Sequence, residues 1–334
     1  MLEGLQAHYR VRRSDPEIAR DLAQQLLTLA EGADKPAELM LAHGALGVEC
    51  LMSGEFAAAR KHLEQASPRL DWSRSGSSGV FYRCFGAWAL WALGYADQAV
   101  EWSHEVLASA EVLSRWEWLA TALALTARLH MFLRDAHMAQ VRADAAIAIA
   151  TEHGFPYELA QGTFVHGWAL AHQGHLEEGV AEMRRAATAL EATGFVARPR
   201  WLAFLAEACA KSDDPGMGLK LLGEGMASMK CTGERIYEAE LHRLKGEFLL
   251  MCDAANALEA EDCFRTAVDV ARRQGGRSLE LRATVSLTGL LEKNDRRDEA
   301  RTMLAQIYNW FTEGFETADL KDARALLDEL GGQR

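Results

Sequence analysis

The chain has 334 residues, a formal net charge of −12, and 49% hydrophobic residues. The acidic balance excludes a general nucleic-acid binder and a protein drawn to anionic membranes, because no basic surplus is available to neutralise phosphates. No apolar run is long enough to cross a bilayer, and the first charged residues are followed by no signal-peptide core, so we expect a cytoplasmic protein. With only six prolines and abundant Ala and Leu, the composition favours an all-α fold.

The first 34 residues resemble the remains of a repeat. The segment "PEIARDLAQQLLTLAEGA" (16–33) has the pattern of the second helix of a helical hairpin, without a first helix before it. We therefore expect a partial N-terminal repeat over residues 1–34. Such a start fits either a fragment of a longer protein or a free-standing helical tail.

Between residues 35 and 314, two small residues recur about every 40 positions. One follows each inter-helix turn by five residues: Ala59, Ala99, Ala139, Gly179, Gly218, Ala260 and Ala300. The other precedes the turn by seven residues: Gly47, Ala87, Ala127, Gly167, Ala206, Gly246 and Thr288. Because two helices pack closely only where facing side chains are small, the pattern predicts about seven helix-turn-helix units stacked into one solenoid.

Glycines are also expected to end the second helices in left-handed conformation. These glycines are Gly154, Gly194, Gly233, Gly275 and Gly314. The Ser/Gly-rich stretch Asp71–Gly79 is predicted to be a loop, and Lys211–Gly216 a tight turn.

The last segment, residues 315–331, predicts a capping helix, because a stacked array leaves an apolar face on its final hairpin. We expect helix 296–311 to end at Gly314, and Thr317 to be the N-cap of the next helix. Phe311 and Phe315 should pin the corner between the two helices. The apolar stripe that would cover the last hairpin is Leu320, Ala323, Leu326, Leu327 and Leu330.

No motif predicts catalysis, a metal site or a cofactor. His166, His172 and His175 lie near one turn, but no further ligand is close in sequence. The six cysteines form no CxxC pair, and most lie among apolar neighbours, so we expect buried free thiols. We therefore expect no enzymatic activity.

The two small positions per unit resemble those of tetratricopeptide (TPR) repeats. The units here are longer than the usual ~34 residues, and the usual proline after the second helix is missing. The resemblance implies a right-handed α-solenoid.

A closer resemblance covers nearly the whole chain. It rests on "YEAELHRLKGEFLL" (237–250), on residues 260–291, and on "YNWFTEGFETADLKDARALLDEL" (308–330). These segments look like the C-terminal TPR-like region of bacterial regulators that join an adenylate cyclase or a DNA-binding module to a STAND-type ATPase. No GxxxxGK[ST] phosphate loop occurs, so the ATPase itself is not in this sequence.

In stacked hairpins the first helices line a concave surface, where ligands can bind. Three neighbouring units place Trp88, Arg128 and Trp168 in one column, so the guanidinium could stack between two indoles. The same column continues with Glu207 and Glu247. Adjacent columns make this groove apolar early and charged late, where Arg200, Glu240, Arg243, Arg282 and Glu292 occur. The candidate partner-binding residues are Trp88, Arg128, Trp168, Phe81, Trp91, Met131, Phe164 and Arg243. The alternative is that these aromatics only pack between units.

Such a groove suits a protein or peptide partner, or a small effector. The expected function is a non-enzymatic scaffold that regulates an associated cyclase or STAND ATPase. Two alternatives stay open: the ligand-sensing tail of a STAND-type transcription activator, and a structural adaptor that forms homo-oligomers.

Overall fold

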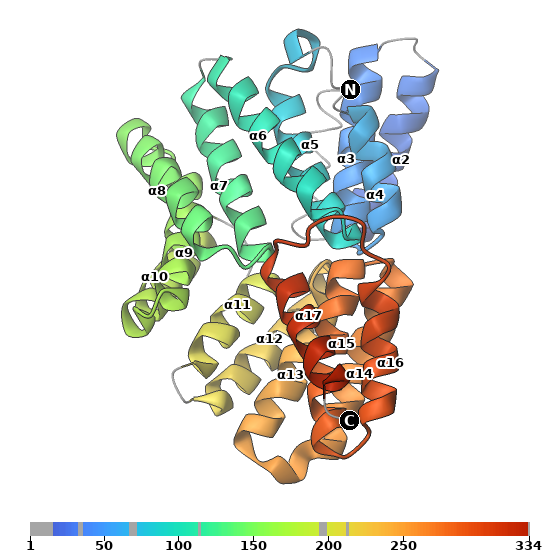
Figure 1. Ribbon diagram of the computed structural model, residues 1–334. Helices are drawn as coiled ribbons and strands as arrows, with labels where there is room; N and C mark the ends of the chain where they lie inside the picture. The colour runs from blue at the N-terminus through green and yellow to red at the C-terminus, as the bar shows by residue number, and fades with distance from the viewer. Residues whose placement is uncertain are drawn as a thin grey trace.

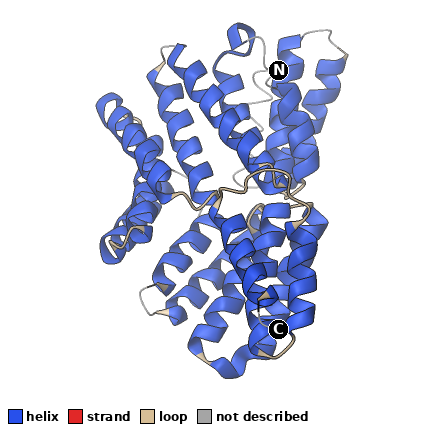
Figure 2. Ribbon diagram, in the orientation of Figure 1, coloured by secondary structure: helices blue, strands red, loops and turns tan. Residues whose placement is uncertain are grey.

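The protein is described by a computed structural model over residues 16–32, 36–66, 72–112, 115–193, 199–211 and 214–332. Within those ranges the chain is helical, with short turns and no strand (Figure 2). The prediction of an all-α, TPR-like solenoid is therefore confirmed. The first fifteen residues of the predicted partial repeat over 1–34, Asp71 of the predicted loop, and Gly194 lie outside the described residues.

After α2 (Pro16–Glu31), the helices follow one another as seven hairpins and a final helix, α17 (Ala318–Gly331) (Figure 1). The hairpins are α3 (Pro36–Met52) with α4 (Phe56–Ala66), α5 (Trp72–Leu93) with α6 (Ala96–Val112), α7 (Trp116–Phe132) with α8 (Ala136–His153), α9 (Pro156–His172) with α10 (Leu176–Ala192), α11 (Pro199–Ala210) with α12 (Pro215–Thr232), α13 (Glu238–Cys252) with α14 (Ala257–Gln274), and α15 (Arg277–Lys293) with α16 (Arg297–Tyr308). A 3-10 turn, η1 (Ala254–Asn256), precedes α14.

The repeated small residues lie where paired helices touch. A methyl group on Gly179 would lie 2.4 Å from the carbonyl oxygen of Gly167, and one on Gly167 would lie 2.8 Å from the carbonyl oxygen of Gly179. The two backbones of α9 and α10 are therefore in direct contact. In the sixth hairpin, a methyl group on Gly246 would lie 2.7 Å from the ring of Phe264. In these hairpins the recurring small residues thus lie where the two helices approach closely.

Left-handed glycines follow three second helices: Gly154, Gly233 and Gly275, with φ of 74°, 63° and 70°. Gly314 is also left-handed, with φ of 77°, but it does not end α16. That helix ends at Tyr308 with Asn309 as its C-cap, and residues 309–317 form a longer corner. The predicted helix over 296–311 was therefore too long at both ends.

The predicted Ser/Gly-rich loop is wrong from Trp72 onward, because α5 is already helical there. The low helix propensity of Ser and Gly is overridden, because this segment continues a helix whose later residues are deeply buried. Residues 212 and 213 of the predicted turn over Lys211–Gly216 lie outside the described residues. After them α12 begins at Pro215, and the Asp214 side chain accepts a hydrogen bond from the Met217 backbone N–H at 3.0 Å.

The first helices of the hairpins contact one another in succession and form an inner layer, while the second helices lie outside them. The superhelix closes on itself, so that α15 also contacts α5, ten helices earlier (Figure 1). One contiguous apolar core runs from Ala23 in α2 to Leu279 in α15. The concave side of the solenoid is therefore largely filled by packing between its two ends.

Helix α17 packs against α15 and α16. Leu320 and Ala323 are buried with Leu281 and Leu304, while Leu330 is buried with Leu287. At the corner Phe311 is buried, but Phe315 is 46% exposed and makes an edge contact with Tyr308. Thr317 occupies the N-cap position, although its hydroxyl donates to the carbonyl oxygen of Gly314 instead of capping α17.

A candidate ligand cavity where the superhelix closes

Arg282 joins three separate parts of the chain. From α15, its Nε donates to Asp319 Oδ2 on α17 at 2.8 Å, and its Nη2 donates to the carbonyl oxygen of Phe132 at the end of α7. Burial by itself lowers the pKa of Arg282, but Asp319 and Glu240 more than reverse this, so the pKa lies above its usual value. The guanidinium is therefore charged and holds the cap to the amino-terminal repeats.

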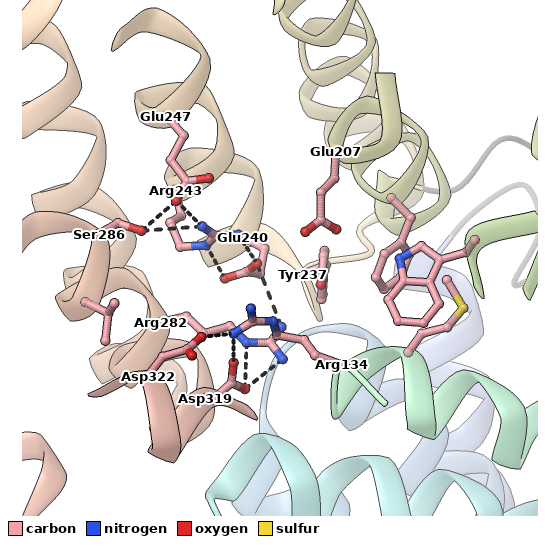
Figure 3. Close-up of a pocket in the computed structure, with 14 residues that line it drawn as sticks. Arg134, Glu207, Tyr237, Glu240, Arg243, Glu247, Arg282, Ser286, Asp319 and Asp322 are labelled. Carbon is pink, nitrogen blue, oxygen red and sulfur yellow. Dashed lines mark hydrogen bonds and ion pairs between the residues drawn. The ribbon is translucent and has the colours of Figure 1, made fainter. Parts of the chain in front are cut away.

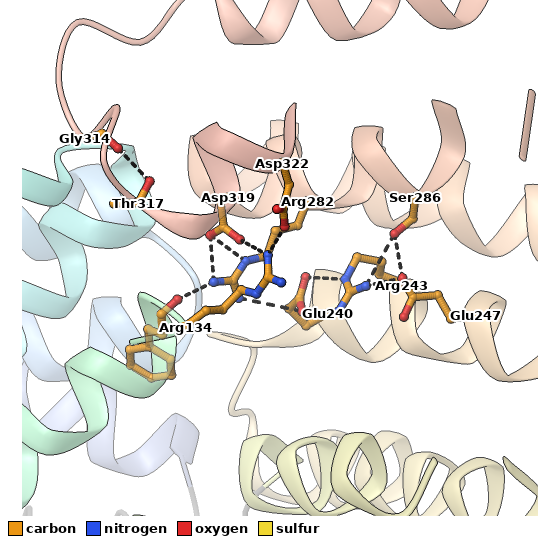
Figure 4. A network of polar contacts seen from close by, with 11 residues as sticks. Arg134, Glu240, Arg243, Glu247, Arg282, Ser286, Gly314, Thr317, Asp319 and Asp322 are labelled. Carbon is orange, nitrogen blue, oxygen red and sulfur yellow. Dashed lines mark hydrogen bonds and ion pairs between the residues drawn. The ribbon is translucent and has the colours of Figure 1, made fainter. Parts of the chain in front are cut away.

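Arg134 approaches the same carboxylate from the turn between α7 and α8. Its Nη1 donates to Asp322 Oδ2 at 2.6 Å and to Asp319 Oδ1 at 3.2 Å (Figure 4). Its backbone is left-handed, with φ of 59°, at the turn position that glycine occupies in three other hairpins. A non-glycine residue there costs of order 1–2 kcal/mol. Asp295 is also left-handed, with φ of 57°, but it is the Arg134 side chain that reaches α17.

Further contacts fasten the two ends together. Ser278 Oγ donates to the carbonyl oxygen of Trp91 at 2.6 Å, and Gln98 Nε2 donates to Glu313 at 2.7 Å. The backbone N–H of Gly314 donates to Asp97 at 3.0 Å. These bonds join residues about 190 to 220 positions apart. Specific hydrogen bonds therefore hold the two ends of the superhelix together.

A cavity of about 240 Å³ lies beside this closure (Figure 3). Its walls come from the inner helices of four hairpins, from the α7 end and turn, and from α17. The lining residues are Met131, Arg134, Trp168, Phe204, Glu207, Tyr237, Glu240, Arg243, Glu247, Arg282, Val285, Ser286, Asp319 and Asp322.

One wall is a paired charge network centred on Arg243. Its Nε and Nη2 donate to the two oxygens of Glu240 at 2.8 and 2.9 Å, and its Nη1 donates to Glu247 (Figure 4). Ser286 Oγ donates to Glu247 at 2.8 Å. Burial lowers the pKa of Arg243, but Glu240 and Glu247 outweigh it, so the pKa stands well above its usual value.

Another wall is aromatic. The rings of Phe204 and Tyr237 lie 5.0 Å apart, and Trp168 meets Phe204 edge-on at 6.3 Å. Burial raises the pKa of Tyr237 well above its usual value, so the phenol is neutral. One buried polar atom in this wall, the Trp168 indole N–H, has no hydrogen-bond partner among the described residues.

In the predicted stripe, Trp88 and Arg128 lie in the core, whereas Trp168 borders the cavity. Arg128 does stack on Trp88, at 5.1 Å, but its second indole is Trp201, at 4.1 Å, and not Trp168. All three predicted side chains are buried, and Trp168 lies against His172 instead. Trp201 was not expected, because it lies in a different column of its unit.

The other predicted groove residues divide into two groups. Trp91 stacks on Phe132 at 4.6 Å, Phe164 meets Trp201 at 4.3 Å, and the partly buried Phe81 meets Phe85 at 4.7 Å. These contacts fill the interior. Met131, Trp168 and Arg243 instead line the cavity, and a ligand role for them stays a prediction.

Sequence columns did indicate Glu207, Glu240 and Arg282 as inward residues, and all three line the cavity. Arg134, Tyr237, Asp319 and Asp322 were missed. The available signal was Arg134 itself, which replaces the glycine that recurs 40 positions before and after it. Asp319 and Asp322 reach the cavity only because the superhelix closes.

Among the described residues, no group of three or more side chains could hold a metal ion. His166 instead contacts Glu182, at 3.0 Å. Four of the six cysteines are buried, whereas Cys231 and Cys252 are exposed. No helix in the described ranges has the length and apolarity needed to cross a membrane.

No family model and no curated protein matches the chain. Among solved structures, a Rap protein complexed with competence and sporulation factor is 12% identical, with a TM-score of 0.57 over 99% of this chain and 97% of that chain. Aspartyl phosphate phosphatase F from Bacillus subtilis is 13% identical, with a TM-score of 0.50 over 90% of this chain and 76% of that chain. At these identities the likeness shows the fold alone, a TPR-like helical repeat.

A STAND protein with a TPR sensor from Pyrococcus horikoshii is 15% identical, with a TM-score of 0.46 over 98% of this chain and 51% of that chain. That overlay is too distant to support a statement about this protein.

Proposed function

We propose that this protein is a non-enzymatic regulatory scaffold that binds a protein, peptide or small effector in the cavity beside the closure. In this proposal the chain is one solenoid, with a partial repeat over 1–34, seven hairpins over 35–314 and a capping helix over 315–331. By its resemblance to the tails of cyclase and STAND regulators, it would control an associated cyclase or STAND-type ATPase in the bacterial cytoplasm.

The observation that carries this proposal is the position of the cavity. Met131, Arg134 and Trp168 come from the amino-terminal hairpins, whereas Tyr237, Arg243 and Asp319 come from the carboxy-terminal hairpins and the cap. A ligand in the cavity touches both ends of the superhelix beside the ion pairs that hold them together. A ligand that binds closed and open arrangements with different affinity would shift the balance between them. The Rap protein of similar fold was solved in complex with competence and sporulation factor.

The binding part is tested by filling the cavity. Val285 lines it and is half-buried, so Val285→Phe would occupy part of its volume. Val141 is 47% exposed on α8, so Val141→Phe is the matched control. A panel of pentapeptides of positive, neutral and negative charge is screened by thermal shift and titration calorimetry.

We expect at least one peptide to bind the parent protein and Val141→Phe equally, and Val285→Phe about tenfold or more weakly. Circular dichroism confirms that both variants fold. Peptides that bind Val285→Phe as tightly as the parent, or a panel without a binder, would contradict the proposed cavity. The regulatory part predicts a cyclase or STAND ATPase domain in or next to the same reading frame; its absence would argue against that partner.

A further inference from the structure

The cavity carries more negative than positive charge. Its carboxylates are Glu207, Glu240, Glu247, Asp319 and Asp322, and its guanidiniums are Arg134, Arg243 and Arg282. Each guanidinium is already engaged by carboxylates. Arg243 holds Glu240 and Glu247, while Arg134 and Arg282 share Asp319. The positive charge of this wall is therefore used within the protein, and a net negative charge remains for a ligand.

Glu207 is the cavity carboxylate that pairs with none of the three arginines. It is half-buried in the cavity wall, yet its side chain makes no hydrogen bond or ion pair with any residue in the described ranges. The charge of Glu207 acts to raise the pKa of Lys211 and of His172, but neither side chain forms an ion pair with it. Its carboxylate faces the cavity (Figure 3) and is therefore available to a ligand.

Tyr237 places a second polar group beside Glu207 in the cavity. The residue is only 3% exposed, and its hydroxyl has no hydrogen-bond partner among the described residues. It feels the charges of Glu240, Arg282 and Glu207, so it lies among the cavity residues. A neutral phenol can accept a hydrogen bond from a cationic N–H donor, and the aromatic wall attracts cations.

We propose that the cavity recognises an alkylammonium or guanidinium group, held between the Glu207 carboxylate and the Tyr237 hydroxyl. This inference rests on the proposed function and deepens it, because it names the chemistry of the ligand. The volume of about 240 Å³ suits one side chain or one small molecule. Anions are disfavoured, since the carboxylates of the cavity outnumber its guanidiniums.

The cation could come from a peptide, as a lysine or arginine side chain, or from a free amine. Titration calorimetry with three probes separates these sources: acetyl-Ala-Ala-Lys-Ala-Ala-amide, the same peptide with norleucine in place of lysine, and cadaverine. Norleucine keeps the alkyl chain and removes the charge. The variant is Glu207→Gln, which keeps shape, and the control is Glu224→Gln, which makes the same charge change on the exposed face of α12.

We expect the lysine peptide or cadaverine to bind the parent and Glu224→Gln equally, and to bind Glu207→Gln about tenfold to a hundredfold more weakly. Binding of the lysine peptide alone identifies a peptide source, and binding of cadaverine alone identifies a free amine. The norleucine peptide should bind at least tenfold more weakly than the lysine peptide.

Three results would overturn the inference: equal affinity of the norleucine peptide, unchanged affinity in Glu207→Gln, or no binding of either cationic probe. None of these decides the proposed function. A neutral or acidic peptide that binds the parent and is blocked by Val285→Phe would keep the cavity as a ligand site while removing its preference for cations.

Discussion

Arg128 and Arg243 both project from inner helices, but they are stabilised in opposite ways. Arg128 lies between two indoles and donates to the Gln161 amide, with another arginine, Arg200, nearby. Burial, followed by the charge of Arg200, lowers the pKa of Arg128 to about 9. Arg243 instead pairs with two carboxylates, and its pKa is raised. The first site is a closed core contact, whereas the second borders open volume, so only the second offers a surface to a ligand.

The largest expected effect concerns the closure beside Arg243. Asp319→Ala removes the main partner of the buried Arg282 and leaves only Glu240, at 3.9 Å, as a counter-charge. Breaking a buried pair in this way should lower the free energy of unfolding by about 3–5 kcal/mol, measured by urea denaturation. Asp322→Ala is the control, because that side chain is 53% exposed and should cost less than about 1 kcal/mol. Equal losses would mean that Arg282 does not depend on Asp319.

The next effect compares the two arginines directly. Arg243→Met leaves Glu240, whose side chain is 2% exposed, without its bidentate partner and should cost about 2–4 kcal/mol in unfolding free energy. Arg128→Met removes a charge that its surroundings disfavour and leaves only an amide unpaired, so it should cost about 1 kcal/mol. The same denaturation experiment measures both. A larger loss for Arg128→Met would show that indole stacking, and not carboxylate pairing, carries more stability.

The smallest expected effect is a change in how stability depends on pH, caused by the partial burial of two histidines. Burial lowers the pKa of His43 and of His62, whose Nδ1 atoms lie 2.9 Å apart, below the ordinary value of 6.5. Below pH 6.5 the unfolded chain therefore binds more protons than the folded chain, so stability falls as pH falls towards the folded-state pKa. We expect His43→Gln/His62→Gln to lose less unfolding free energy than the parent between about pH 7.5 and 5.5. The exposed His137→Gln should behave like the parent; equal pH profiles for all three proteins would contradict this assignment.

The sequence was most informative where one residue type can satisfy a local geometric need. Small residues were required where α9 meets α10, and glycines where Gly154, Gly233 and Gly275 turn left-handed. It was misleading at Trp72–Gly79, where local propensity predicted a loop and tertiary context keeps a helix. It also gave the inward register of Glu240 and Arg282, because columns in a stacked array repeat with the unit.

By itself the sequence therefore determined the repeat, the hairpins and the inner columns, since these follow from contacts between neighbours in the chain. The sequence could not determine which inner residues become buried when the two ends of the superhelix pack together. That depended on how far the superhelix curves, a sum of small rotations over seven hairpins. Only the tertiary structure brought α17 and Arg134 to Arg282, enclosed Trp88 and Arg128 in the core, and left Glu207 and Tyr237 beside an open cavity.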